Sequence, residues 1–333
     1  MAEAKYDVLG IGNAIFDVLV KTDEKFLSRH GMTKGGMALI DEARAASIYR
    51  DMGPATEMSG GSAANTIVGI ASFGARAAYV GKVKNDQIGK LYTHDIRAAG
   101  VAFDTRPASD GPATGCSYIL VTDDGERTMN TYLGAAQELM PSDIDAAEIA
   151  AAKIVYLEGY LWDPASAKQA FVKAATIAHS AGREVALTLS DSFCVDRYRD
   201  EFLDLMRKGT VDLVFANEAE LHSLYQTSDF DTALKELRKD TKLAVVTRSE
   251  KGCVVASQDG VVAVPACPID RLVDTTGAGD LFAAGFLFGL VRNAGHENAG
   301  RLGALAAAEV IQHIGARPLA SLKELAQNSG LPV

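Results

Sequence analysis

Short apolar runs alternate with longer amphipathic stretches along most of this chain. The strand-like runs cover residues 6–11, 77–80, 154–157, 184–189, 213–216 and 243–247. The stretches between them repeat apolar residues at helical spacing, as in residues 62–73, 163–181 and 232–239. Such alternation is typical of βαβ units and predicts an α/β fold with a central, mainly parallel sheet. The stretch 277–290 is apolar almost all round, which indicates a buried helix.

Two segments, residues 13–44 and 104–134, interrupt this alternation. They are richer in β-branched residues, glycine and polar residues. In the second segment an Asp-Gly turn separates two strand-like runs, a pattern that favours a β-hairpin. We expect the two segments to form a small β-sheet lid. The main domain would then comprise residues 1–12, 45–103 and 135–333.

Composition and charge narrow the class of protein. The 333 residues are 48% hydrophobic, which is enough for one large core. A formal net charge of -10 disfavours nonspecific binding to nucleic acid or to an anionic membrane surface. No apolar run is long enough to span a membrane, and the N-terminal residues lack a signal-peptide pattern, so we expect a cytoplasmic protein. The four cysteines and six histidines show no disulfide or zinc spacing.

The strongest local signal is DTTGAGD at residues 274–280, directly before the buried helix. Gly277 and Gly279 allow a tight turn into the helix and a close approach to a ligand. The N–H groups of the first helical turn would then form an anion site. Asp280 could accept a proton from an attacking hydroxyl, as phosphoryl transfer requires. The alternative is that Asp274 and Asp280 only cap the helix.

A second glycine-rich turn, Gly60-Gly61, precedes the helix at residues 62–73. It is not a Walker A loop, because the GK[ST] ending is absent. Adjacent glycines indicate a hinge or a close backbone approach, and Asn65 could then face a ligand. The other reading is a helix start with small packing residues.

Polar pairs also follow two of the expected strands. Asn13 and Asp17 follow the first one, where Ile15 breaks a dinucleotide-binding fingerprint. Asp17 has apolar neighbours, so ligand hydroxyls or a turn must satisfy its carboxylate. Asn217 and Glu220 follow the run 213–216, at the sheet edge where ligands bind. Glu220 could hold hydrated magnesium, or the pair could simply begin a solvated helix.

These motifs, in this order, resemble the PfkB (ribokinase-like) carbohydrate and nucleoside kinase family along almost the whole chain. GGSAANT at 60–66 is similar to the first family signature, DTTGAGD to the second, and NEAE at 217–220 to the NxxE motif. The resemblance implies a ribokinase-like three-layer α/β/α sandwich with a small β-sheet lid. It also implies an ATP-dependent kinase acting on an alcohol group.

The resemblance assigns roles to individual residues. Asp280 would be the catalytic base, with the backbone of Gly277, Ala278 and Gly279 as the anion hole for the γ-phosphate. Asp17 would bind two ribose or sugar hydroxyls, while Gly61 and Asn65, next to Gly60, would contact the same sugar. Phosphates and Mg²⁺ would be placed by Asn217 and Glu220. The positions that run beside ATP are Thr247, Arg248 and Gly252. A monovalent cation such as K⁺ would be held by Asp274, Thr276, Val310 and Gly315, whereas Leu319 stands where some members have a serine ligand.

Within the family, residues 12–17, 114–116 and 189–193 are most similar to the adenosine kinases. That resemblance implies phosphoryl transfer from Mg-ATP to the 5′-hydroxyl of adenosine or a related purine nucleoside. Arg127 matches an arginine that approaches the phosphates when the lid closes. A flat base needs an apolar slot, for which the candidates are Ile15, Met37, Leu39, Cys116, Met129, Leu161 and Phe193.

Two alternatives remain open at this point. The first is a sugar kinase of the same family acting on ribose, fructose or a related sugar. The second is a catalytically silent ligand-binding protein on the same fold. In each case we expect small-molecule partners, and the chain could be a monomer or a homodimer.

Overall fold

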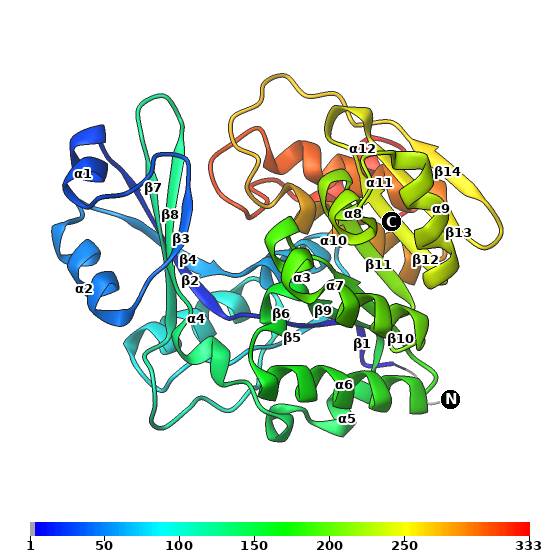
Figure 1. Ribbon diagram of the computed structural model, residues 1–333, viewed down its shortest axis with the longest axis horizontal. Helices are drawn as coiled ribbons and strands as arrows, with labels where there is room; N and C mark the ends of the chain where they lie inside the picture. The colour runs from blue at the N-terminus through cyan, green and yellow to red at the C-terminus, as the bar shows by residue number, and fades with distance from the viewer. Residues whose placement is uncertain (1–3) are drawn as a thin grey trace.

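The computed structural model describes residues 4–333, which form a large sheet and a small sheet (Figure 1). The large sheet has nine strands in the order β14-β13-β12-β11-β10-β9-β1-β5-β6. Its strands are β1 (Tyr6–Ile11), β5 (Ala77–Val80), β6 (Val101–Ala102), β9 (Ala152–Glu158), β10 (Glu184–Thr188), β11 (Leu213–Asn217), β12 (Leu243–Thr247), β13 (Cys253–Ser257) and β14 (Val261–Val264). All pairs are parallel except those of β13, so the predicted mainly parallel sheet is confirmed.

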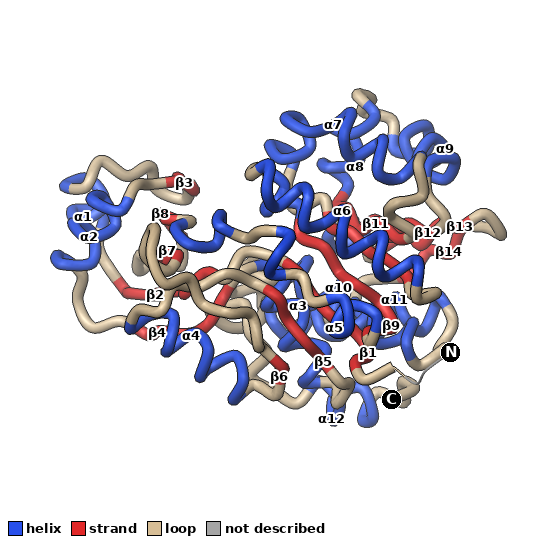
Figure 2. Tube along the Cα trace, turned by 90° about the horizontal axis from the view of Figure 1, so that it is seen from below, coloured by secondary structure: helices blue, strands red, loops and turns tan. Residues whose placement is uncertain are grey.

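Helices cover both faces of the large sheet, as Figure 2 shows. Alternate strand residues point into two separate hydrophobic clusters: Val8 faces the first and Leu9 the second. The first is closed by α3 (Ser62–Ser72), α4 (Gln87–Ala98), α10 (Ala278–Val291), α11 (His296–Val310) and α12 (Leu322–Asn328). The second is closed by α5 (Ala146–Ala150), α6 (Ala165–Ser180), α7 (Ser192–Arg207), α8 (Glu218–Tyr225) and α9 (Phe230–Asp240). This is the expected three-layer sandwich, with α10 as the predicted buried helix.

The small sheet has the order β3-β8-β7-β2-β4 and is called the lid, together with α1 (Glu24–Arg29) and α2 (Glu42–Asp51). It stands apart from the large sheet at one end of the molecule (Figure 1). Its strands are β2 (Ile15–Lys21), β3 (Met37–Leu39), β4 (Thr56–Gly60), β7 (Gly115–Val121) and β8 (Arg127–Tyr132). The predicted hairpin is confirmed as the antiparallel pair β7–β8.

The expected lid boundary at residue 45 has to move, because β4 and most of α2 lie beyond it. β4 pairs antiparallel with β2, from Ile15 opposite Gly60 to Leu19 opposite Thr56. Its sequence, TEMSG, offers one large apolar residue and so has no strand pattern of its own. Pairing with β2, not local propensity, makes this segment a strand.

One face of the lid is turned to its own helices. Phe16 and Val18 of β2 pack in one cluster with Phe26 of α1 and Ile48 of α2. Because side chains alternate along a strand, Asp17 points to the opposite face. None of the described helices, within residues 4–333, is long and apolar enough to cross a membrane.

Candidate active site

The two glycine-rich motifs meet at Asp280. This residue lies in the first turn of α10, where Ser62 Oγ donates to its Oδ1 at 2.6 Å and Asn65 Nδ2 to its Oδ2 at 3.0 Å. Both donors come from the first turn of α3. The carboxylate is therefore held between the N-termini of two helices, an arrangement that a capping role alone does not require.

The backbone conformation and the close packing at these helix starts require glycine at two positions. Gly277 precedes α10 with φ at 79°, and a β-carbon there would lie 2.8 Å from Cα of Ala316. Gly61 precedes α3 with φ at 100°, and a β-carbon there would lie 2.1 Å from the carbonyl oxygen of Asn13. Any other residue would be strained at both positions. The first-turn N–H groups that follow Gly277 have no acceptor within the helix, so this end of α10 can bind an anion.

The charge state of Asp280 suits a proton acceptor. Burial raises the pKa of Asp280 to about 6, while the hydrogen bonds from Ser62 and Asn65 and the charge of Arg317 act in the opposite direction. The carboxylate is thus mostly ionised at neutral pH, yet its basicity is greater than that of an ordinary aspartate. A pKa close to the working pH is what general-base catalysis favours.

Asp17 is the second carboxylate of the site. A β-carbon at Gly60 would lie 2.2 Å from its Oδ2, so the carboxylate lies directly over the 60–61 turn. Among the described residues 4–333, none donates a hydrogen bond to it. Burial raises the pKa of Asp17 to about 7, Asp280 acts in the same direction, and Arg317 and Arg127 oppose it. A carboxylate in this position is a ready acceptor for ligand hydroxyls.

The lid reaches the anion-binding loop through Arg127, the first residue of β8. Its NH2 lies 2.6 Å from Oδ2 of Asp274, and its NH1 donates to Oγ1 of Thr276 at 3.1 Å. Asp274 also accepts from the backbone N–H groups of Thr276 at 3.0 Å and Gly315 at 3.1 Å. Arg127 is therefore placed beside the loop that precedes the start of α10, and its approach to the phosphates stays a prediction.

These contacts do not fit the expected monovalent cation. The carboxylate of Asp274 is surrounded by N–H donors and neutralised by Arg127, and Thr276 accepts from the same guanidinium. Val310 and Gly315 have no side-chain ligand atom, and Gly315 turns its N–H to Asp274. Leu319, at the position of the serine ligand, is 76% exposed. Arg127 supplies the positive charge that the cation would bring.

Asn217 and Glu220 form a reciprocal helix cap at the start of α8. Asn217 Oδ1 accepts from the N–H of Glu220 at 2.8 Å, while the Glu220 carboxylate accepts from Asn217 N at 3.0 Å and Nδ2 at 2.6 Å. Glu220 is 4% exposed, and burial raises its pKa to about 7. No group of three or more metal-binding side chains occurs within residues 4–333. A water-mediated link from Glu220 to the magnesium of Mg-ATP stays a prediction.

The other ATP candidates lie at the same sheet edge. Thr247 ends β12 opposite Asn217 in the register of the sheet. Arg248 donates to Oε1 of Glu218 at 2.7 Å and stacks 3.7 Å from the ring centroid of Phe230. Gly252 follows on the tight turn into β13. The Arg248 guanidinium is thus engaged within the protein.

Four of the candidates for an apolar slot share the Asp17 face of the lid. Residues that are paired across neighbouring strands point to the same face of the sheet. Across β2, β7, β8 and β3, one such row is Asp17, Ser117, Thr131 and Leu39, and the next is Leu19, Ile119, Met129 and Met37. Ile15 lies two residues from Asp17 and has the same orientation.

The remaining three candidates are placed differently. Cys116 pairs with Phe16 and so points to the opposite face of the lid. Leu161 is completely buried in the second hydrophobic cluster and offers no surface to a ligand in this conformation. Phe193, on the first turn of α7, is 80% exposed at the edge where β10 ends.

Sequence reasoning overlooked two charged residues beside the site. Glu158, at the end of β9, is 1% exposed and accepts from Asn13 N and Nδ2 and from Ala63 N. Glu158 therefore links Asn13 to the start of α3, and the Asn13 side-chain amide is engaged by this carboxylate. A carboxylate at a strand end was a usable signal for Glu158. Arg317, a single arginine in a loop, gave no signal.

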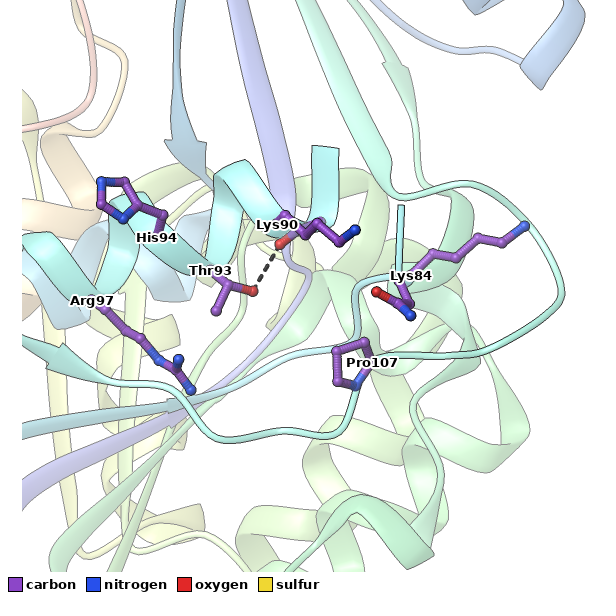
Figure 3. Close-up of a pocket in the computed structure, with 8 residues that line it drawn as sticks. Lys84, Lys90, Thr93, His94, Arg97 and Pro107 are labelled. Atoms are coloured by element: carbon purple, nitrogen blue, oxygen red, sulfur yellow. Dashed lines mark hydrogen bonds between the residues drawn. The ribbon is translucent and has the colours of Figure 1, made fainter. Parts of the chain in front are cut away.

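A separate hollow of about 380 Å³ lies against α4, and Figure 3 shows its residues. It is lined by Lys84, Asn85, Gly89, Lys90, Thr93, His94, Arg97 and Pro107. Two of its cations are already engaged: Lys84 donates to Gly111 O at 2.6 Å, and Arg97 pairs with Asp104 at 2.8 Å. None of the site residues described above lines it.

Comparison with known proteins agrees with this geometry. Residues 52–322 match the pfkB family of carbohydrate kinases. The adenosine kinase of Sinorhizobium meliloti is 57% identical, with a TM-score of 0.91 over 98% of this chain and 100% of that one. A probable sugar kinase from Rhizobium etli CFN 42 is 54% identical, with a TM-score of 0.93 over 99% and 100%. Adenosine kinase 2 of Arabidopsis thaliana is 26% identical over 94% of this chain and 96% of its own length. The fold is thus ribokinase-like, and the chain belongs to the pfkB carbohydrate kinase family of phosphotransferases.

Proposed function

We propose that this kinase transfers the γ-phosphate of Mg-ATP to the 5′-hydroxyl of adenosine or a closely related purine nucleoside. The observation that carries the proposal is the position of Asp280. Its carboxylate is fixed by Ser62 and Asn65 beside the N-terminus of α10, and its pKa is about 6. A proton acceptor and an anion site therefore lie next to each other, as phosphoryl transfer requires.

The proposed step uses Asp280 as a general base. The 5′-hydroxyl oxygen attacks the γ-phosphorus in line, and its proton passes to the Asp280 carboxylate. The bond between the γ-phosphorus and the bridging oxygen breaks, and its electron pair leaves with ADP. The N–H groups after Gly277 stabilise the charge on the moving phosphoryl group. Magnesium arrives with ATP as part of the substrate and neutralises phosphate charge.

The remaining residues orient the nucleoside. Asp17 has no donor from the described part of the protein, which leaves its oxygens available to the ribose hydroxyls. Ser62 and Asn65 fix the direction in which Asp280 accepts the proton. Because both carboxylates adjoin the 60–65 turn, a small movement of this turn changes their separation. Catalysis depends on such positioning within a fraction of an ångström.

Three large apolar side chains favour a nucleoside over a free sugar. Met37 and Leu39 are about half exposed on the Asp17 side of the lid, and Phe193 is largely exposed. A flat purine base would cover such surface, whereas a sugar offers hydroxyls that need polar partners. The two adenosine kinases reported above support the same choice.

A free sugar is the second candidate acceptor, because the Rhizobium etli relative described as a probable sugar kinase is nearly as similar. An ADP-release assay at fixed Mg-ATP would compare adenosine, inosine, guanosine, ribose and fructose. We expect the highest kcat/KM with adenosine. If a sugar is phosphorylated and none of the nucleosides is, the nucleoside assignment is rejected. If none of the five compounds raises ADP release above the rate without acceptor, both assignments are rejected.

A further inference from the structure

Arg317 joins three parts of the site with one side chain. It follows Ala316, which packs against Gly277 at the start of α10. Its NH2 donates to Ser59 O at 2.7 Å and to Ser59 Oγ at 3.1 Å, and its Nε donates to the same carbonyl at 3.2 Å. Its NH1 donates to Ala64 O at 3.0 Å. The guanidinium thus connects the loop beside the anion site to β4 and to α3.

The two acceptors lie on either side of the Gly60–Gly61 turn. Ser59 belongs to the last residues of β4, in the lid, and Ala64 to the first turn of α3, in the main domain. Two residues of α4 hold the same turn from the other side. Asp95 Oδ2 accepts from Ser59 N at 2.7 Å, and Tyr92 OH donates to Gly60 O at 3.2 Å. The turn is therefore clamped at a point where two glycines would otherwise leave it pliable.

The charge of Arg317 has no direct carboxylate partner. Within residues 4–333 its hydrogen bonds all go to neutral carbonyl and hydroxyl oxygens, and it forms no ion pair. A half-buried cation of this kind is costly unless nearby groups balance it. Burial lowers the pKa of Arg317, and the surrounding acidic groups oppose that change. The ionisable groups that face it are Tyr79 of β5, Tyr92 and Asp95 of α4, Asp17 of β2 and Asp280 of α10.

We propose that Arg317 is a positioning residue: it holds the substrate-binding turn against the anion site and balances the charges of Asp17 and Asp280. This rests on the proposed function, because those two carboxylates are its substrate-binding and proton-accepting groups. The positive charge of Arg317 lowers the pKa of both groups, against the effect of their burial. Loss of the charge would raise both pKa values, so a higher pH would be needed to ionise them.

The test uses R317Q, R317K and a control, R238Q. Arg238 is also half-buried and also donates from Nε to a backbone carbonyl, that of Ser257 at 3.1 Å, but it lies on α9. In R317Q we expect kcat/KM with adenosine to fall by about 10–100-fold and the acid limb of its pH profile to move up by about one pH unit. In R317K the limb should stay in place, because the charge is kept. R238Q should match the wild type in both respects.

A second measurement does not depend on activity. Hydrogen exchange of the ligand-free protein should be faster at residues 59–66 in R317Q and R317K than in the wild type or R238Q. Titration of ¹³C-labelled aspartate should show higher pKa values in R317Q alone.

If the wild type phosphorylates no nucleoside, the proposed function fails, while exchange and titration still decide the role of Arg317. Wild-type exchange in R317K, or an unshifted aspartate titration in a folded R317Q, would overturn the proposal. Should R317Q not fold, exchange in R317K decides.

Discussion

The guanidinium of Arg127 in the lid lies 2.6 Å from the carboxylate of Asp274, next to the turn that precedes α10 in the main domain. Both side chains are almost entirely buried. Asp274 would otherwise be a buried carboxylate whose remaining partners within residues 4–333 are two backbone N–H groups. The pair therefore links the position of the lid to the charge balance of the proposed phosphate site.

Monovalent cations should have no effect on turnover, since Arg127 already neutralises Asp274. Replacing K⁺ by tetramethylammonium at constant ionic strength should leave the initial rate of the wild type unchanged. In R127Q the carboxylate of Asp274 loses its cation, so turnover should fall and then be partly restored by K⁺. Activation of the wild type by K⁺ would contradict this account.

Replacing Asp280 by Asn should remove the general base with little change in shape. We expect kcat to fall by about 10²–10⁴-fold, with ATP still bound. A suitable control is D229N, because Asp229 caps α9 through the N–H of Thr232 and lies outside the site. Steady-state kinetics with both variants would check this. Turnover of D280N close to that of D229N would exclude Asp280 as the base.

Acid should inactivate the enzyme through Asp280 and Asp17. Their pKa values are raised to about 6 and about 7, so both become protonated as the pH falls through that range. A protonated Asp280 cannot accept the proton of the substrate hydroxyl. We therefore expect kcat/KM to decline below about pH 7, and the decline to become a single step in D17N. A profile that is flat down to pH 5 would be inconsistent with these groups.

The free energy of unfolding should rise as the pH falls, whereas the activity should decline. The carboxyls of Asp17, Glu158, Glu220 and Asp280 all have pKa values raised by burial, so the folded protein binds protons more tightly than the unfolded chain. Their contribution to stability is then fully present at low pH and is lost as the pH rises through about 6 to 7. Urea unfolding at pH 5.5 and pH 8 would measure this, with the larger free energy of unfolding expected at pH 5.5.

Two neighbouring glycines offer a matched pair of variants. Alanine at 277 meets Ala316 at 2.8 Å in a left-handed conformation, so we expect a loss of about 1–3 kcal/mol in the free energy of unfolding. Alanine at 279 meets no atom within 4 Å and lies inside α10, so stability should be unchanged or slightly higher. A loss of activity in a stable G279A would then indicate that the added methyl group crowds the phosphate. A lower free energy of unfolding in G279A would contradict the open space found around Gly279.

Much of the fold follows from local pattern. Each apolar run became a strand of the large sheet because a strand buried on both faces needs a continuous apolar sequence. β4 could not be predicted, since Thr56 to Gly60 become a strand only by pairing with β2. Local sequence also left the role of Glu220 open, because a capping box and an NxxE ligand motif have the same spacing.

The site was predictable only in part. DTTGAGD and GGSAANT are local signals, but the contact between Ser62 and Asp280 joins positions 218 residues apart in the chain. Arg317 and Cys116 show the limits more sharply. The role of Arg317 depends on backbone carbonyls, which no residue pattern encodes. The orientation of Cys116 depends on a register that only the assembled lid defines.

Two of the connections between the lid and the main domain are very short, which has a thermodynamic consequence. β2 follows β1 after three residues, and β4 runs into α3 through Gly61 alone. Asp17 and the 60–61 turn therefore move whenever the lid moves. Under the proposed function, nucleoside affinity is then thermodynamically coupled to the population of lid orientations. A substitution on the outer helices α1 or α2 that shifts the lid should change KM without touching the nucleoside, in proportion to the shift in population.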